Sequence, residues 1–265
     1  MQDRPPVPPW RGGGRPSPTL IFAVLAAVSV TPALAHRDDY LNETFVFQTL
    51  EAHEFEPEVW LDFGPAKDDR PRFTAWSAAF EYGLTKHWMV DGFAGWMDPT
   101  GEAASLHRLR AETRVRFGEE GDRRVDVAAS FEIEYEKVRE PVVPGSPALP
   151  DVERDWSLTP RLVLSRDLPH EWNVTLNLDL VCELRQGRSD RWTPGYALAA
   201  RYPREAFLRY GVELRQDFGE ERESLLVPQV WLSFPHEATL KIGAGIDLDG
   251  PSRQSFLRTV FEVEF

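Results

Sequence analysis

The sequence predicts an all-β protein, a single antiparallel up-and-down β-barrel of about twelve strands. Apolar and polar residues alternate through most of the chain after residue 54, and short and long connections between the alternating segments follow one another. The chain also ends inside such a segment, on Phe261-Glu262-Val263-Glu264-Phe265. Alternation with a period of two is typical of a strand with one apolar and one polar face.

The first half of the barrel is predicted from five alternating segments. In the first, Val59, Leu61 and Phe63 share one face, while Glu58 and Asp62 share the other. Four more segments repeat this pattern before the middle of the chain. The predicted strands of this half cover residues 55–63, 76–84, 88–97, 109–117 and 125–136.

The second half supplies seven further segments with the same pattern. They cover residues 156–164, 172–180, 196–202, 208–214, 226–234, 240–248 and 257–265. Most are close to the length of about ten residues that a tilted strand needs to cross a bilayer. Tryptophan residues stand near both ends of the segments, as the two interfacial girdles of a membrane barrel require. A transmembrane barrel is therefore favoured over a soluble β-sandwich or a closed periplasmic barrel, which would also alternate.

The connections predict which rim faces which compartment. Short turns are expected near residues 86, 120, 167–169, 203–205 and 235–237, and longer loops near 98–105, 137–155, 186–193, 218–224 and 249–254. Short periplasmic turns and longer extracellular loops are typical of bacterial outer-membrane barrels. With an even number of strands, both ends of the chain fall on the short-turn rim.

The N-terminal residues 1–35 are predicted to be a secretory signal peptide. Three arginines precede an apolar run at residues 19–30, and Ala33-Leu34-Ala35 matches a small-residue cleavage site. An uncleaved anchor is the alternative, and the Pro- and Gly-rich residues 1–18 suggest that translation starts further along. Residues 36–54 are expected to form a periplasmic stub or a plug inside the lumen, with an extra strand or a short helix as alternatives. Residues 55–265 would form the barrel.

Composition excludes some classes of partner. The net charge of −13 becomes more negative once the predicted signal peptide and its arginines are removed, so a nucleic-acid partner is not expected. Cys182 is the only cysteine, which rules out an intrachain disulfide. After residue 35 no apolar run is long enough for a spanning helix, so membrane insertion would require strands.

The polar faces of the predicted strands are rich in charge and would point into the lumen. Rows of facing acids and arginines either fill a narrow barrel with ion pairs or line a channel that selects solutes by charge. The lumen-facing candidates are Glu56, Glu58, Asp62, Glu81, Arg110, Glu112, Arg114, Arg116, Asp126, Glu132, Glu134, Asp179, Glu262 and Glu264. Phe261, Val263 and Phe265 would face lipid and act as the assembly signal.

Enzymatic chemistry, a cofactor and a bound metal are not predicted. Ser105 and His107 are two residues apart, but no acid partner and no nucleophile motif accompany them. His36 and His53 are close enough in sequence to suggest chelation, which needs further ligands; solvated side chains are the simpler expectation.

One hairpin carries a resemblance to known proteins. Glu81, Tyr82, Gly83, Leu84, Thr85 and Trp88 match the "EYGLT-x-x-W" motif. This hairpin resembles that of a group of bacterial outer-membrane barrels similar to the transporters associated with the phenol meta-cleavage pathway. The resemblance implies an outer-membrane location and a channel or transporter role. The partners expected for the whole protein are outer-membrane lipid, the barrel-assembly machinery, which reads the terminal strand, and a small solute.

The sequence thus predicts an outer-membrane channel or transporter for small solutes. The first alternative is a filled-lumen barrel with a structural role, or with surface interactions through the Pro-rich loop at residues 141–150. The second is a barrel lipid hydrolase that uses Ser105 and His107. The sequence does not indicate the solute or the oligomeric state.

Overall fold

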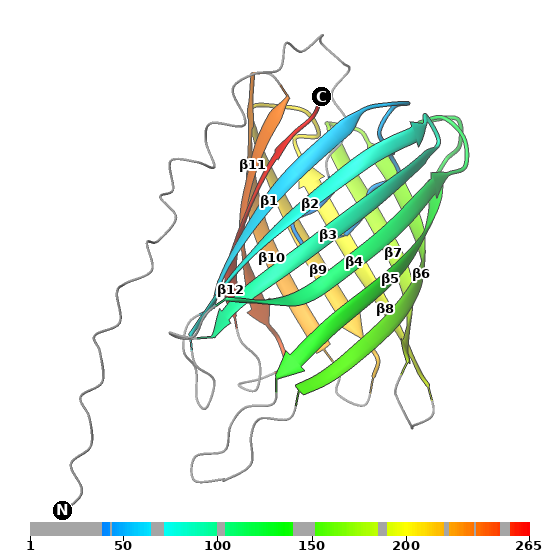
Figure 1. Cartoon of the computed structure of the whole chain (residues 1–265). Helices are drawn as coiled ribbons and strands as arrows, with labels where there is room; N and C mark the ends of the chain where they lie inside the picture. The colour runs from blue at the N-terminus through cyan, green and yellow to red at the C-terminus, as the bar shows by residue number, and fades with distance from the viewer. Residues whose placement is uncertain are drawn as a thin grey trace, which may run out of the picture. The chain divides into compact units, whose positions relative to one another are not determined.

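The computed structural model describes residues 39–42, 44–64, 72–99, 104–139, 152–184, 190–219, 223–235, 237–249 and 255–265. They form a closed barrel in which each strand pairs antiparallel with its neighbours in sequence (Figure 1). The predicted twelve-stranded antiparallel barrel is confirmed. Its strands are β1 (Phe55–Gly64), β2 (Phe73–Thr85), β3 (Trp88–Pro99), β4 (Ser105–Arg116), β5 (Asp126–Arg139), β6 (Val152–Leu168), β7 (Trp172–Leu184), β8 (Arg191–Tyr202), β9 (Leu208–Asp217), β10 (Glu223–Phe234), β11 (Ala238–Asp247) and β12 (Phe256–Val263).

Several strands extend beyond the predicted segments. Strand β6 begins at Val152, not at residue 156, and β8 begins at Arg191, not at residue 196. Both extensions continue the backbone ladder with a neighbouring strand, since Val152 pairs with Arg139 and Arg191 pairs with Glu183. Backbone pairing does not depend on side-chain polarity, so a strand can continue where the apolar stripe has ended.

The last strand closes the barrel against the first. Val59 of β1 lies opposite Phe261 of β12, and Glu58 lies opposite Glu262. Beyond β12, Phe55 and Phe265 exchange two backbone hydrogen bonds of 3.1 and 3.0 Å. Closure leaves no unpaired sheet edge, which is the condition for a sheet that sits in lipid.

The two faces of the sheet differ sharply in polarity. Val59, Leu61 and Phe63 of β1 point outward and are exposed, and outward apolar side chains of other strands continue this band around the barrel. Aromatic pairs lie on this surface near both rims, with Trp76 stacked on Trp96 and Trp172 stacked on Tyr202. The inward face carries the buried acids, arginines and amides.

The connections follow the expected alternation of length, with one difference. The turns after β2, β6, β8 and β10 are short, whereas the connection after β4 runs from residue 117 to 125. It folds into a compact loop in which Asp122 N donates to Glu119 O and Gly121 N donates to the Asp126 carboxylate. The predicted signal peptide and the Pro-rich loop at 141–150 lie outside the described residues. The described residues contain no helix that is long and apolar enough to cross a membrane.

A segment that precedes β1 occupies the barrel interior. We call residues 39–42 and 44–50 the inner segment; its residues 44–50 form neither a strand nor a helix. Tyr40, Leu41, Val46, Phe47 and Leu50 are all buried. Leu41 packs with the inward residues Trp60, Phe93 and Val227, and Val46 packs in a second cluster with Trp231.

Two inward glycines make room for this segment. A Cβ atom added to Gly243 of β11 would lie 2.4 Å from Leu41 Cδ2 and 2.8 Å from Pro228 O. A Cβ atom on Gly83 of β2 would lie 1.8 Å from Glu51 O, where the chain leaves the interior for β1. Any larger side chain at these positions would have to displace the inner segment or the backbone beside it.

Candidate functional site

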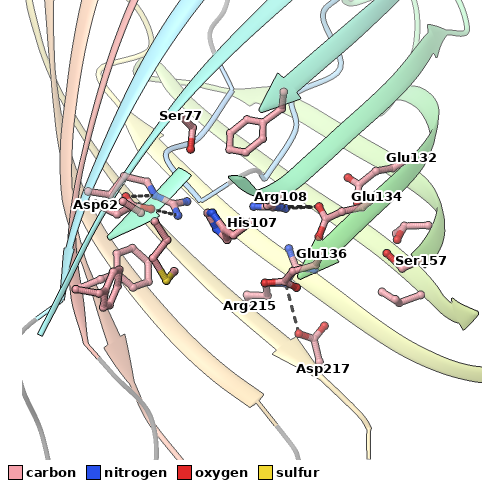
Figure 2. A pocket seen from close by; sticks show the side chains of 18 of the residues that line it. Asp62, Ser77, His107, Arg108, Glu132, Glu134, Glu136, Ser157, Arg215 and Asp217 are labelled. Carbon is pink, nitrogen blue, oxygen red and sulfur yellow. Dashed lines mark hydrogen bonds and ion pairs between the residues drawn. The ribbon is translucent and has the colours of Figure 1, made fainter. Parts of the chain in front are cut away.

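The half of the barrel nearest the long loops encloses a polar cavity of about 470 Å³. Its wall comes from the ends of β1–β7, β9 and β12 that lead to or from those loops, and Figure 2 shows the side chains that point into it. Its charged residues are Asp62, Arg108, Glu132, Glu134, Glu136, Arg161, Arg215, Asp217 and Arg258. We call this cavity the vestibule.

Acidic side chains of β5 form one wall of the vestibule. Glu132, Glu134 and Glu136 follow one another at every second position, so all three point inward. In Figure 2 they lie together on the side of the cavity opposite Asp62. The Arg108 guanidinium contacts Glu134 at 2.6 Å, and both side chains keep some solvent exposure.

The other arginines of the vestibule are also paired with acids. Arg258 makes two hydrogen bonds of 2.8 Å to the two carboxylate oxygens of Asp62. Arg161 lies 2.6 Å from Asp179, and Arg215 lies 3.5 Å from the same acid. Asp179 is buried below the cavity, so two of the lining arginines are neutralised from beneath.

The inner segment lies beside the vestibule, although none of its described residues lines the cavity. Its tip is held by Glu213, whose carboxylate accepts hydrogen bonds from Asn42 N at 2.7 Å and from the Thr44 hydroxyl at 2.6 Å. Arg258, from the vestibule wall, also donates to the Asn42 side chain at 3.3 Å. The contact between Arg258 and Asn42 therefore connects the wall of the open cavity to the filled half of the lumen.

Further contacts hold the inner segment along its length. Arg114 contacts Asp39 at 2.5 Å and lies over the Phe45 ring, 4.1 Å from its centroid. From β7, Thr175 donates to Phe45 O at 3.1 Å. The Tyr40 hydroxyl donates to the Asn173 side-chain oxygen at 3.2 Å.

The filled half also contains a cluster of acids from β1 and β12. Glu56, Glu58 and Glu262 offer carboxylate oxygens within 4.8 Å of one another. Lys241 lies 2.5 Å from Glu262, so its ammonium group compensates part of their negative charge. The same ammonium donates to Asp39 O at 2.8 Å, which links this cluster to the inner segment.

The structure places all the predicted lumen-facing residues on the inner face of the barrel. Asp62 and Glu134 are half-buried beside the vestibule, and the other acids and arginines of the set are buried. Asp62, Glu132 and Glu134 line the vestibule, whereas Asp179 and Arg114 lie outside its lining, where they contact Arg161 and Asp39. Arg116 instead lies at the short-turn rim, 3.4 Å from Glu51.

Several residues of the site were absent from the predicted set. Arg108, Arg161, Arg215 and Arg258 line the vestibule, and the alternation of their strands would have identified them as inward. The alternation of β9 would likewise have identified Glu213 as inward. No local pattern indicated that the inner segment would lie against it, because those contacts join residues about 170 positions apart.

Ser105 and His107 do not form a hydrolytic site among the described residues. His107 lines the vestibule, but no hydrogen bond joins its ring to Ser105, and Ser105 does not line the cavity. A nucleophile and its base need to be within hydrogen-bond reach of each other. The geometry therefore offers no support for the hydrolase alternative.

Comparisons with known proteins give the fold a context. The sequence matches no protein-family model, and no curated protein matches it. Among solved structures, an outer-membrane channel from Pseudomonas putida F1 has a TM-score of 0.55 at 13% identity, over 83% of this chain and 98% of that one. The KdgM porin in complex with disordered oligogalacturonate has a TM-score of 0.53 at 11% identity, over 80% and 99% of the two chains.

These likenesses cover nearly the whole of both neighbours and concern the fold. The chain therefore has the barrel fold of outer-membrane channels and porins.

Proposed function

We propose that this protein is an outer-membrane channel for small polar solutes, closed at rest by the inner segment. The observation that carries the proposal is the pairing of an open, charged vestibule with a filled lumen directly beneath it. A solute entering from the long-loop rim would meet the tip of the inner segment, at Asn42 and Thr44. Passage would require this tip to move.

The outer surface supports an outer-membrane location. A band of outward apolar side chains with aromatic residues near both rims suits a bilayer with two interfaces. In this orientation the short turns face the periplasm. The link to transporters associated with the phenol meta-cleavage pathway is a finer part of the proposal, which rests on the β2–β3 hairpin resemblance alone.

The contacts of the inner segment are compatible with movement. Many of them are hydrogen bonds and ion pairs to wall residues, such as Glu213 and Arg114, rather than a continuous apolar core. Water entering the lumen can replace polar contacts of this kind at modest net cost. A segment held in this way could leave the lumen without unfolding the strands.

Conductance in planar bilayers tests the proposal. The full chain should show small or rare currents, and a variant lacking residues 39–50 should show larger and more frequent openings. Heat-modifiable mobility on gels would establish that the shortened barrel has assembled. An assembled barrel that shows no conductance without residues 39–50 would contradict the channel and favour the filled-lumen alternative. The buried ion pairs of the lumen are the observation that supports that alternative.

A further inference from the structure

The charges of the vestibule do not balance. Its lining holds the acids Asp62, Glu132, Glu134, Glu136 and Asp217, against the arginines Arg108, Arg161, Arg215 and Arg258. Each of these arginines already contacts at least one carboxylate within 3.5 Å. Asp179, which lies outside the lining, takes up part of the charge of Arg161 and Arg215. The cavity surface therefore carries an excess of negative charge.

Glu136 contributes most directly to this excess. It is exposed at the mouth of the vestibule, and no hydrogen bond or ion pair joins its carboxylate to another described residue. Arg108 lies opposite Glu136 on β4, but its guanidinium is directed to Glu134. A positive charge placed beside Glu136 would therefore not have to displace an existing ion pair.

A second acid stands beside Glu136 on the next strand. Asp155 of β6 is directly opposite Glu136 of β5 in the antiparallel ladder. Like charges directly opposite each other in a sheet are destabilising unless a cation lies between them or nearby. Glu132, deeper on the same wall, reaches Arg161 only at 3.7 Å. Glu136 and Glu132 line the cavity, and Asp155 lies beside Glu136 just outside the lining.

We propose that the vestibule binds small organic cations, and that Glu136, with Asp155 and Glu132, sets this preference. A bound ammonium group would be attracted by Glu136 and Asp155, and a second cationic group would reach toward Glu132. Walls with a net charge of one sign concentrate counter-ions in a cleft and select solutes by charge. The inference gives the solute class of the proposed channel and rests on that function, but binding can be measured without conduction.

Calorimetric titration of the folded full chain in detergent tests the inference with three probes of similar length. The probes are 1,4-diaminobutane, the dianion succinate and the neutral 1,4-butanediol. The diamine should bind, its affinity should fall as salt is added, and the other two should give little or no heat. Tighter binding of succinate, equal binding of all three probes, or no binding of the diamine would overturn the proposal.

Two variants with the same change of charge locate the site. Glu136→Gln should weaken diamine binding at least about tenfold, the equivalent of one charge-assisted contact. Glu171→Gln, in the exposed turn after β6 at the opposite rim, should leave it unchanged. Diamine binding that is insensitive to Glu136→Gln, or equally sensitive to both changes, would contradict the assignment.

The outcomes separate this inference from the proposed function. A barrel that conducts after removal of residues 39–50 but binds no diamine would overturn the cation preference and leave the channel standing. A barrel that binds the diamine through Glu136 but never conducts would overturn the channel.

Discussion

The two halves of the lumen are built from the same kinds of residue and yet differ in what fills them. In the long-loop half, arginine–acid pairs such as Arg108–Glu134 line a cavity of about 470 Å³ and remain partly solvated. In the short-turn half, pairs such as Arg114–Asp39 are enclosed by the inner segment and Arg114 is buried. A charged inner wall therefore does not by itself decide whether a barrel is open. In this barrel, the half that contains the inner segment is filled and the half without it is open.

The largest expected effect comes from removing a cation in the filled half. Arg114→Ala would leave the part-buried Asp39 without its guanidinium partner and leave the buried Glu112 with Arg161 alone, at a cost of about 3–5 kcal/mol. Part of this loss should appear as release of the inner segment. Urea unfolding in lipid vesicles, followed by tryptophan fluorescence, measures the change in stability.

Arg108→Ala is the matched control on the same strand. Its partner Glu134 borders the vestibule and can be solvated once the arginine is gone, so the expected cost is about 1 kcal/mol or less. Equal costs for the two substitutions would remove the energetic distinction between the two halves.

A smaller effect is expected from filling the space that Gly243 leaves for the inner segment. Gly243→Ala would place a methyl group 2.4 Å from Leu41 Cδ2, at a cost of about 1–3 kcal/mol unless the segment shifts. Conductance should then rise, because a displaced Leu41 would open space in the filled half of the lumen. An alanine here that changes neither stability nor conductance would show that the tip of the segment is not tightly seated.

How much of this could be read from the sequence depends on the range of the contacts involved. Alternation predicted the twelve strands and the closure of the last on the first, because strand periodicity is local and pairing of neighbours follows chain order. Closure between Val59 and Phe261 needed only the strand count in addition. The inner face of charged residues followed from the same period.

The position of the inner segment inside the barrel could not be predicted from strand alternation. Residues 44–50 alternate weakly, so a strand, a helix, a stub and a plug all remained open. Their place depends on Glu213, Ser165 and Thr175, which lie more than 100 positions further along the chain. Which arginine pairs with which acid likewise depends on side-chain geometry, as Arg108 shows by contacting Glu134 rather than its direct neighbour Glu136.

A further effect concerns the rim of the filled half, where the barrel closes. Removal of Phe265 would delete two backbone hydrogen bonds to Phe55 and an outward aromatic side chain, at a cost of about 2 kcal/mol. We predict impaired assembly, seen as loss of heat-modifiable mobility on gels. Normal assembly without Phe265 would count against a role for Phe261, Val263 and Phe265 as an assembly signal.

The contrast between the two halves can be measured directly by thiol accessibility. In a Cys182→Ala background, Ser157→Cys would report on the vestibule and Thr175→Cys on the wall behind Phe45. A membrane-impermeant maleimide should label the first position rapidly and the second hardly at all, and deletion of residues 39–50 should make the second reactive. Rapid labelling at position 175 with the inner segment in place would contradict the claim that this segment closes the short-turn half of the barrel.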